Sequence, residues 1–154
     1  MILGIDPGLS GGLALVSLRG ALVAAEAMPV LRNAVATIDV RALSGFLRAA
    51  SGAEILGYVE RAQAMPRQGV SSAFSYGVLF GSVLTAIASE GIGYELVSPA
   101  RWKRDLGLSA DKRESVDRVR QLYPGFEIKN REDGIAEAIL IARWAWQQTC
   151  RSAA

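Results

Sequence analysis

The sequence contains no histidine, which excludes His-based triads, imidazole general bases and most zinc sites. Its single cysteine, Cys150, cannot form an internal disulfide, as is typical of a reducing compartment. It has no basic leader followed by an apolar stretch, and no apolar run approaches the roughly 20 residues of a membrane helix. We therefore expect a cytoplasmic protein whose chemistry, if any, uses carboxylates, lysines, hydroxyls or metal-bound water.

The composition suits one folded domain spanning residues 1–154. Hydrophobic residues make up 51% of the chain, enough for a buried core, and no repeat or linker divides it. The net charge is only +2, but its distribution is uneven: from Arg101 to Arg131, nine basic residues stand against five acidic ones. Such a cluster is typical of phosphate binding, although a solvated helix with ion pairs gives the same pattern.

Apolar runs and turn signals predict a mixed α/β fold. The segments "ILGID", "GLALVSL" and "ALVAAEAM" predict three antiparallel strands. Helical spacing over about 39–50 and 71–89 alternates with the strands "EILGYVE" and "IGYELVSP", and further helices are expected over about 99–102, 110–122 and 133–148. This order predicts a five-stranded mixed sheet flanked by helices, with the antiparallel strands first.

Four carboxylates stand at element ends. Asp6 and Glu60 end predicted strands, and Asp133 and Glu137 lie four residues apart at the start of the last helix, on one face. Ends of adjacent strands face one crevice, so the four acids are expected to converge. Because the last helix is apolar nearly all round, acids at its entry need a cation or backbone amides, and Mg²⁺ is the obvious partner.

Each of these acids also has an ordinary alternative role. Asp6 precedes Pro7-Gly8 and suits a turn, while Glu60 suits a surface charge at a strand end. Asp133 and Glu137 suit the positive end of a helix dipole. The joint occurrence of the four acids in this order favours a metal-binding site.

Four segments together resemble the RuvC-type Holliday junction resolvases of the ribonuclease H-like superfamily, especially phage or prophage members. They are "ILGIDPGLSGGLALV", "YVERAQAM", "VSPARWKRDLGLSADKRESV" and "GIAEAILIARW". The resemblance spans nearly the whole chain. It implies a ribonuclease H-like fold and a metal-dependent endonuclease that resolves four-way junctions by paired nicks, leaving 5′-phosphate and 3′-hydroxyl ends.

The resemblance also implies the roles of individual residues. Asp6, Glu60 and Glu137 match the family's acidic metal-binding positions, and Asp133 takes the remaining one. In the family, the last two ligands are usually three residues apart and the second is an aspartate. Here they are four residues apart, and the second is Glu137. Two Mg²⁺ per site, replaceable by Mn²⁺, would assist hydrolysis. Lys103 and Lys112 match basic residues near the scissile phosphate, although either would also suit an ordinary solvated lysine.

DNA contacts and assembly follow from the same resemblance. The loop from Arg61 to Gly69 is the candidate for contacts at the junction centre, with Met65 as an apolar wedge, although Met65 would equally cap the core. A homodimer is expected through the helix with Gly77 and Gly81, whose spacing permits close helix approach or tight packing on its own sheet. Branched DNA is the expected partner, with neither membrane nor nucleotide cofactor, in a bacterium or acting there from a phage. The residues expected to hold DNA are Met65, Arg67, Gln68, Arg101, Lys103, Arg104, Lys112 and Arg113.

Three other functions remain open from the sequence. A related nuclease acting on flaps or forks would share every feature above. A non-catalytic junction-binding module would keep the fold, although the presence of all four acids disfavours it. An actin-like ATP-binding fragment would use residues 6–12 as a phosphate loop, but that fold needs two duplicated domains, for which 154 residues are too few.

Overall fold

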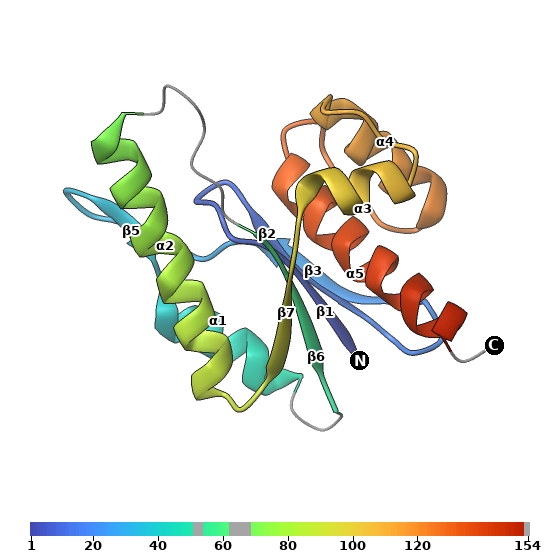
Figure 1. Cartoon of the computed structure of the whole chain (residues 1–154), viewed down its shortest axis with the longest axis horizontal. Helices are drawn as coiled ribbons and strands as arrows, with labels where there is room; N and C mark the ends of the chain where they lie inside the picture. The colour runs from blue at the N-terminus through green and yellow to red at the C-terminus, as the bar shows by residue number, and fades with distance from the viewer. Residues whose placement is uncertain (51–53, 62–68, 153–154) are drawn as a thin grey trace.

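The computed structural model describes residues 1–50, 54–61 and 69–152, and its centre is a five-stranded sheet of order β3-β2-β1-β6-β7 (Figure 1). β1 (Ile2–Asp6), β2 (Gly12–Val16) and β3 (Leu22–Ala27) pair antiparallel. β6 (Leu56–Glu60) pairs parallel with β1, and β7 (Gly93–Val97) parallel with β6. The predicted mixed sheet, with its antiparallel strands first, is confirmed.

Helices cover both faces of the sheet (Figure 1). On one side, α1 (Val40–Ala49) and α2 (Val70–Ser89) pack their apolar residues against Leu3, Ile5 and Leu13. On the other, α5 (Asp133–Ser152) lies in a second apolar cluster, to which α3 (Pro99–Asp105) and α4 (Lys112–Leu122) contribute. The central strands are therefore buried on both faces, as their apolar sequences predict.

Glycines let α5 lie directly on the sheet. A Cβ at Gly4 of β1 would overlap the backbone carbonyl of Ala138, and one at Gly134 would overlap the Ser10 carbonyl. Only glycine allows two backbones to approach this closely. The start of α5 is thereby held against the turn that follows Asp6.

The structure also departs from the prediction at several boundaries. A hairpin of β4 (Val30–Arg32) and β5 (Ala36–Ile38) was not predicted, because its strands are only three residues long and its turn lacks glycine and proline. α5 continues to Ser152 rather than ending near residue 148, and α3 continues to Asp105 rather than ending at Trp102. Helix ends are poorly marked where no glycine or proline follows directly.

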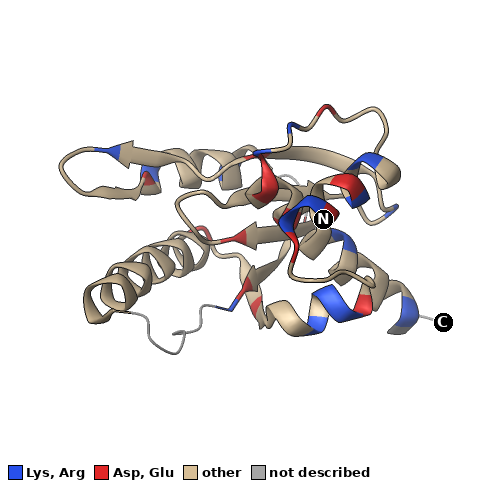
Figure 2. Ribbon diagram, turned by 90° about the horizontal axis from the view of Figure 1, so that it is seen from above, with Lys and Arg blue, Asp and Glu red and all other residues tan. Residues whose placement is uncertain are grey.

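α2 carries an uncovered apolar face. By length and composition it is the one described helix able to cross a membrane, with a mean hydropathy of 1.5, which corrects the expectation that no segment reaches this length. Serines and glycines interrupt its apolar run, but no charged residue does (Figure 2). Val70, Phe74 and Val78 are 88%, 73% and 48% exposed, so much of this helix lies outside the core of the monomer.

Candidate active site

Asp6 and Glu60 lie at the same edge of the sheet. β1 and β6 run parallel with Ile5 opposite Val59, so their next residues, Asp6 and Glu60, emerge side by side. Asp6 Oδ1 also accepts a hydrogen bond from the Gly8 backbone at 3.4 Å. The turn-forming role of Asp6 is therefore compatible with the site role that the sequence predicts.

The four acids influence one another electrostatically. Burial, followed by the nearby carboxylate of Glu137, raises the pKa of Asp6 to about 6, and Asp133 contributes in the same direction. Burial raises the pKa of Glu60 to about 7, with Asp6 and Glu137 adding to the shift. Acids from two strands and the last helix are therefore near enough to affect one another's pKa values.

Two lysines reach into this acidic cluster. Lys103 Nζ lies 2.6 Å from Glu137 Oε1, and the two side chains are only 17% and 7% exposed. Lys112, at the start of α4, forms an ion pair with Asp133 at the start of α5. Lys103 is therefore no ordinary solvated lysine, while Lys112 is exposed yet bound to a site carboxylate.

The arrangement of the acids differs from the metal site that the sequence predicts. Among the described residues, no three Asp, Glu or Cys side chains lie close enough together to hold one metal ion. In this arrangement, the ammonium groups of Lys103 and Lys112 bind Glu137 and Asp133. The donors nevertheless fit a hard divalent cation, because they are buried or half-buried carboxylates, and repulsion from neighbouring acids contributes to the raised pKa values of Asp6 and Glu60.

Two further residues of the site were missed from the sequence. Trp102, which is fully buried, donates a hydrogen bond from Nε1 to Glu60 Oε2 at 2.8 Å. Burial raises the pKa of Tyr76 on α2 to about 12, with Asp6 and Glu60 adding to the shift, so its hydroxyl lies near both acids. The position of Trp102 directly before Lys103 was a signal that could have been used, whereas nothing in the sequence marks Tyr76.

The predicted DNA-contacting residues fall into separate groups. Met65, Arg67 and Gln68 lie outside the described residues. Arg101 stacks over Trp144, its guanidinium carbon 5.2 Å from a ring centroid, and Arg104 pairs with Asp105 at 3.0 Å. Because Trp144 lies about two turns along α5 from Glu137, Arg101 and Arg104 are not brought to the acids as Lys103 and Lys112 are.

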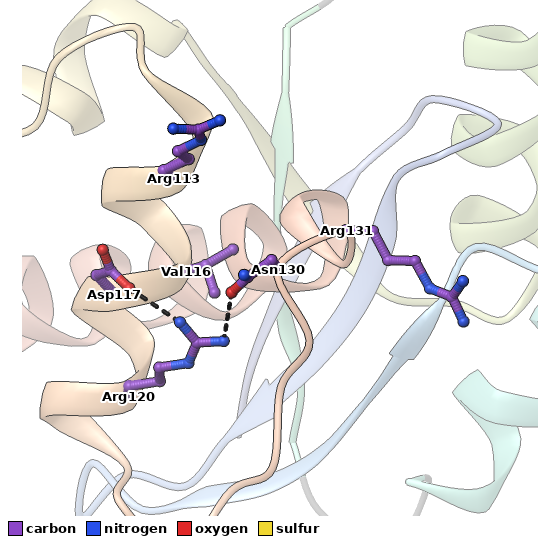
Figure 3. Close-up of a pocket in the computed structure, with 6 residues that line it drawn as sticks. All are labelled: Arg113, Val116, Asp117, Arg120, Asn130 and Arg131. Carbon is purple, nitrogen blue, oxygen red and sulfur yellow. Dashed lines mark hydrogen bonds and ion pairs between the residues drawn. The ribbon is translucent and has the colours of Figure 1, made fainter.

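Arg113 lies at a separate basic pocket of about 480 Å³ between α4 and the segment before α5 (Figure 3). Within it, Arg120 is held by Asp117 at 3.0 Å and by Asn130 at 2.7 Å. The guanidinium groups of Arg113 and Arg131 point outward on different sides, away from Arg120. These two arginines follow Lys112 and precede Asp133 in sequence, so the pocket adjoins the acidic cluster.

The fold of this chain is similar to that of several solved structures, each less than 25% identical in sequence. Thermus thermophilus RuvC in complex with a Holliday junction superposes with a TM-score of 0.67 and 24% identity, over 97% of this chain and 94% of that one. The fowlpox virus resolvase, solved with Holliday junction DNA, superposes with a TM-score of 0.59 and 14% identity, over 96% of this chain and 99% of that one. The yeast mitochondrial Holliday junction resolvase superposes with a TM-score of 0.55 and 15% identity, over 98% of this chain and 80% of that one. No family model and no curated protein matches the chain.

Proposed function

We propose that this chain is a metal-dependent, structure-selective DNA endonuclease that resolves Holliday junctions by paired nicks. The observation that carries the proposal is the convergence of Asp6, Glu60, Asp133 and Glu137, with Lys103 and Lys112, at one edge of a resolvase-like sheet. Such a site needs no histidine base, in keeping with the composition. The cytoplasm of a bacterium, or of a bacterium infected by a phage, is the proposed place of action.

The acids have one task in this mechanism and the lysines another. Asp6, Glu60, Asp133 and Glu137 would hold Mg²⁺ ions, which when bound supply an activated water and stabilise the leaving oxygen. Lys103 and Lys112 already face carboxylates, so cation binding would free their ammonium groups. The freed ammonium groups would then neutralise charge that develops on the phosphate.

DNA would approach over the basic side of the cluster. Arg113 follows Lys112 directly in the chain and Arg131 precedes Asp133 by two residues, and the outward guanidinium groups of the two arginines suit phosphates at several points along a backbone rather than one small anion (Figure 3). Within the described residues, neither arginine has a side-chain ion pair. The backbone of a junction arm would therefore cross this pocket next to the cleavage site.

A two-fold dimer through α2 is part of the proposal. Paired nicks need two sites related by the symmetry of the junction. Outside the backbone of α2 itself, a Cβ at Gly77 or Gly81 would meet no atom of the described residues within 4 Å, so within this part of the chain these glycines do not serve packing on the sheet. Together with exposed Phe74 and Val78, they form an apolar surface on which a second α2 would lie closely.

A second candidate function is junction binding without cleavage. It is favoured by the ion pairs of Lys103 and Lys112, which already neutralise two of the four acids among the described residues. In that case the acids would position lysines for phosphate binding rather than hold a metal ion. A related nuclease that cuts flaps or forks would differ from both candidates in the substrates that it cleaves.

The test compares three labelled substrates: a four-way junction, a flap and a linear duplex. Each is incubated with the pure protein in Mg²⁺ or EDTA, and the nicks are mapped on both strands. We expect symmetric Mg²⁺-dependent nicks in the junction, absent when Asp6→Asn protein purified identically is used. Binding without cleavage of any substrate would support the second candidate, and preferred flap cleavage would reassign the substrate.

A further inference from the structure

The indole of a buried tryptophan donates a hydrogen bond to one of the site carboxylates. Trp102 is 0% exposed, and its Nε1 donates to Glu60 Oε2 at 2.8 Å. The next residue of the same helix, Lys103, binds Glu137 at 2.6 Å. α3 therefore contacts acids from both β6 and α5 with two consecutive side chains.

The local structure fixes the position of this indole. α3 is a short helix capped by the Ser98 side chain, which accepts a hydrogen bond from the Arg101 backbone, and Pro99 occupies its first turn. Trp102 projects from it into the apolar cluster beneath α5. A buried indole N–H needs an acceptor, and Glu60 Oε2 is the acceptor present. The contact therefore restrains the carboxylate as well as the indole.

We propose that Trp102 is a positioning residue, which holds Glu60 by Oε2 so that Oε1 is presented for binding a divalent cation. Within the described residues, Oε1 accepts no hydrogen bond, while Oε2 is engaged by the indole. Hydrogen bonds to ligating carboxylates orient them, and their loss typically weakens metal binding about 10- to 100-fold. The inference rests on the metal-dependent function proposed above.

The test uses two tryptophans in matched environments. Trp144 is also buried, at 2% exposure, and its Nε1 also donates to a carboxylate, Asp105 Oδ2, at 3.0 Å, but Asp105 is not part of the acidic cluster. Mn²⁺ binding to the full chain is measured by titration calorimetry without DNA, and junction cleavage is measured against Mn²⁺ concentration. We expect Trp102→Phe to weaken Mn²⁺ binding about 10-fold or more. Trp144→Phe should bind Mn²⁺ like the wild type.

A second variant separates the hydrogen bond from the packing. 3-Benzothienylalanine at position 102 keeps the shape of the two fused rings but replaces the N–H by sulfur, so it leaves no cavity. It should weaken Mn²⁺ binding like Trp102→Phe, and excess Mn²⁺ should restore the cleavage rate of both variants.

Unchanged Mn²⁺ binding in the 3-benzothienylalanine protein, or equal weakening in Trp144→Phe, would overturn the role of Trp102 alone. A wild-type protein that binds no Mn²⁺ would overturn this role together with the proposed function. The two failures are therefore distinguishable.

Discussion

At the scale of single residues, Asp6 is the most informative position. Asp6→Asn is nearly isosteric but removes the anionic ligand. We expect Mg²⁺-dependent cleavage to be abolished and junction binding in EDTA to remain near the wild-type level, measured by gel shift and single-turnover cleavage. Loss of both activities in a folded variant would mean that Asp6 serves DNA binding.

The raised pKa values of Asp6 and Glu60 predict how stability depends on pH. Their values of about 6 and about 7 exceed those of unfolded carboxyls, so the folded protein binds more protons between about pH 4 and 7. The stability of the metal-free protein should therefore fall as pH rises through this window, as thermal unfolding in EDTA will show. Asp6→Asn should remove part of this fall, worth at most roughly 3 kcal/mol. An unchanged pH profile in Asp6→Asn would contradict the assignment.

Substitutions of the two neighbouring cationic residues Lys112 and Arg113 on α4 should have different effects on cleavage and on DNA affinity. Lys112 binds Asp133, whereas Arg113 points away beside the basic pocket. Lys112→Ala should slow cleavage of bound junction about 10²-fold, because a preorganised charge near the phosphate is lost. Arg113→Ala should lower affinity and reduce the slope of log K against log salt by about 0.9, with the bound complex cleaving normally. If both variants changed only affinity, Lys112 would be a positioning residue for DNA.

At the scale of elements, α2 carries the surface on which the proposed dimer depends. In Gly81→Leu, the new Cβ lies within 4 Å of no atom of the described residues beyond the backbone of α2, so the monomer should remain folded. A bulky side chain there would prevent close approach of a second α2, and sedimentation should show monomers. Gly45→Leu on α1 is the matched control, since its Cβ is equally unobstructed, and it should leave the dimer intact. A wild-type monomer that still nicks both strands in concert would contradict the dimer.

The elements also show what a sequence can and cannot predict. The strand ends bearing Asp6 and Glu60 were predictable, because apolar runs ending in an acid mark both a strand and its edge. The β4–β5 hairpin was not, because strands of three residues carry too little periodic pattern. The partners of the acids were not predictable either. The contact between Trp102 and Glu60 joins residues 42 positions apart and depends on how α3 packs.

At the scale of the whole molecule, the site depends on the contact between the first turn and the last helix. Gly134→Ala would force a methyl group into the Ser10 carbonyl, so we expect a loss of about 2 kcal/mol or more in unfolding free energy. Denaturant unfolding measures this loss. Gly45→Ala, in an exposed part of α1, should instead stabilise by up to about 1 kcal/mol. Equal effects of the two substitutions would contradict the close approach.

The same closure would tie any cutting activity to the synthesis of α5. Asp6 is synthesised well before Asp133 and Glu137, which belong to α5, the helix that packs on β1 and β2. A polypeptide that ends before α5, whether still growing or cut short by a premature stop codon, carries only Asp6 and Glu60 of the four acids. Under the proposed function such a fragment would not cut DNA, so a cell would be exposed to cutting only after α5 has been made and has docked.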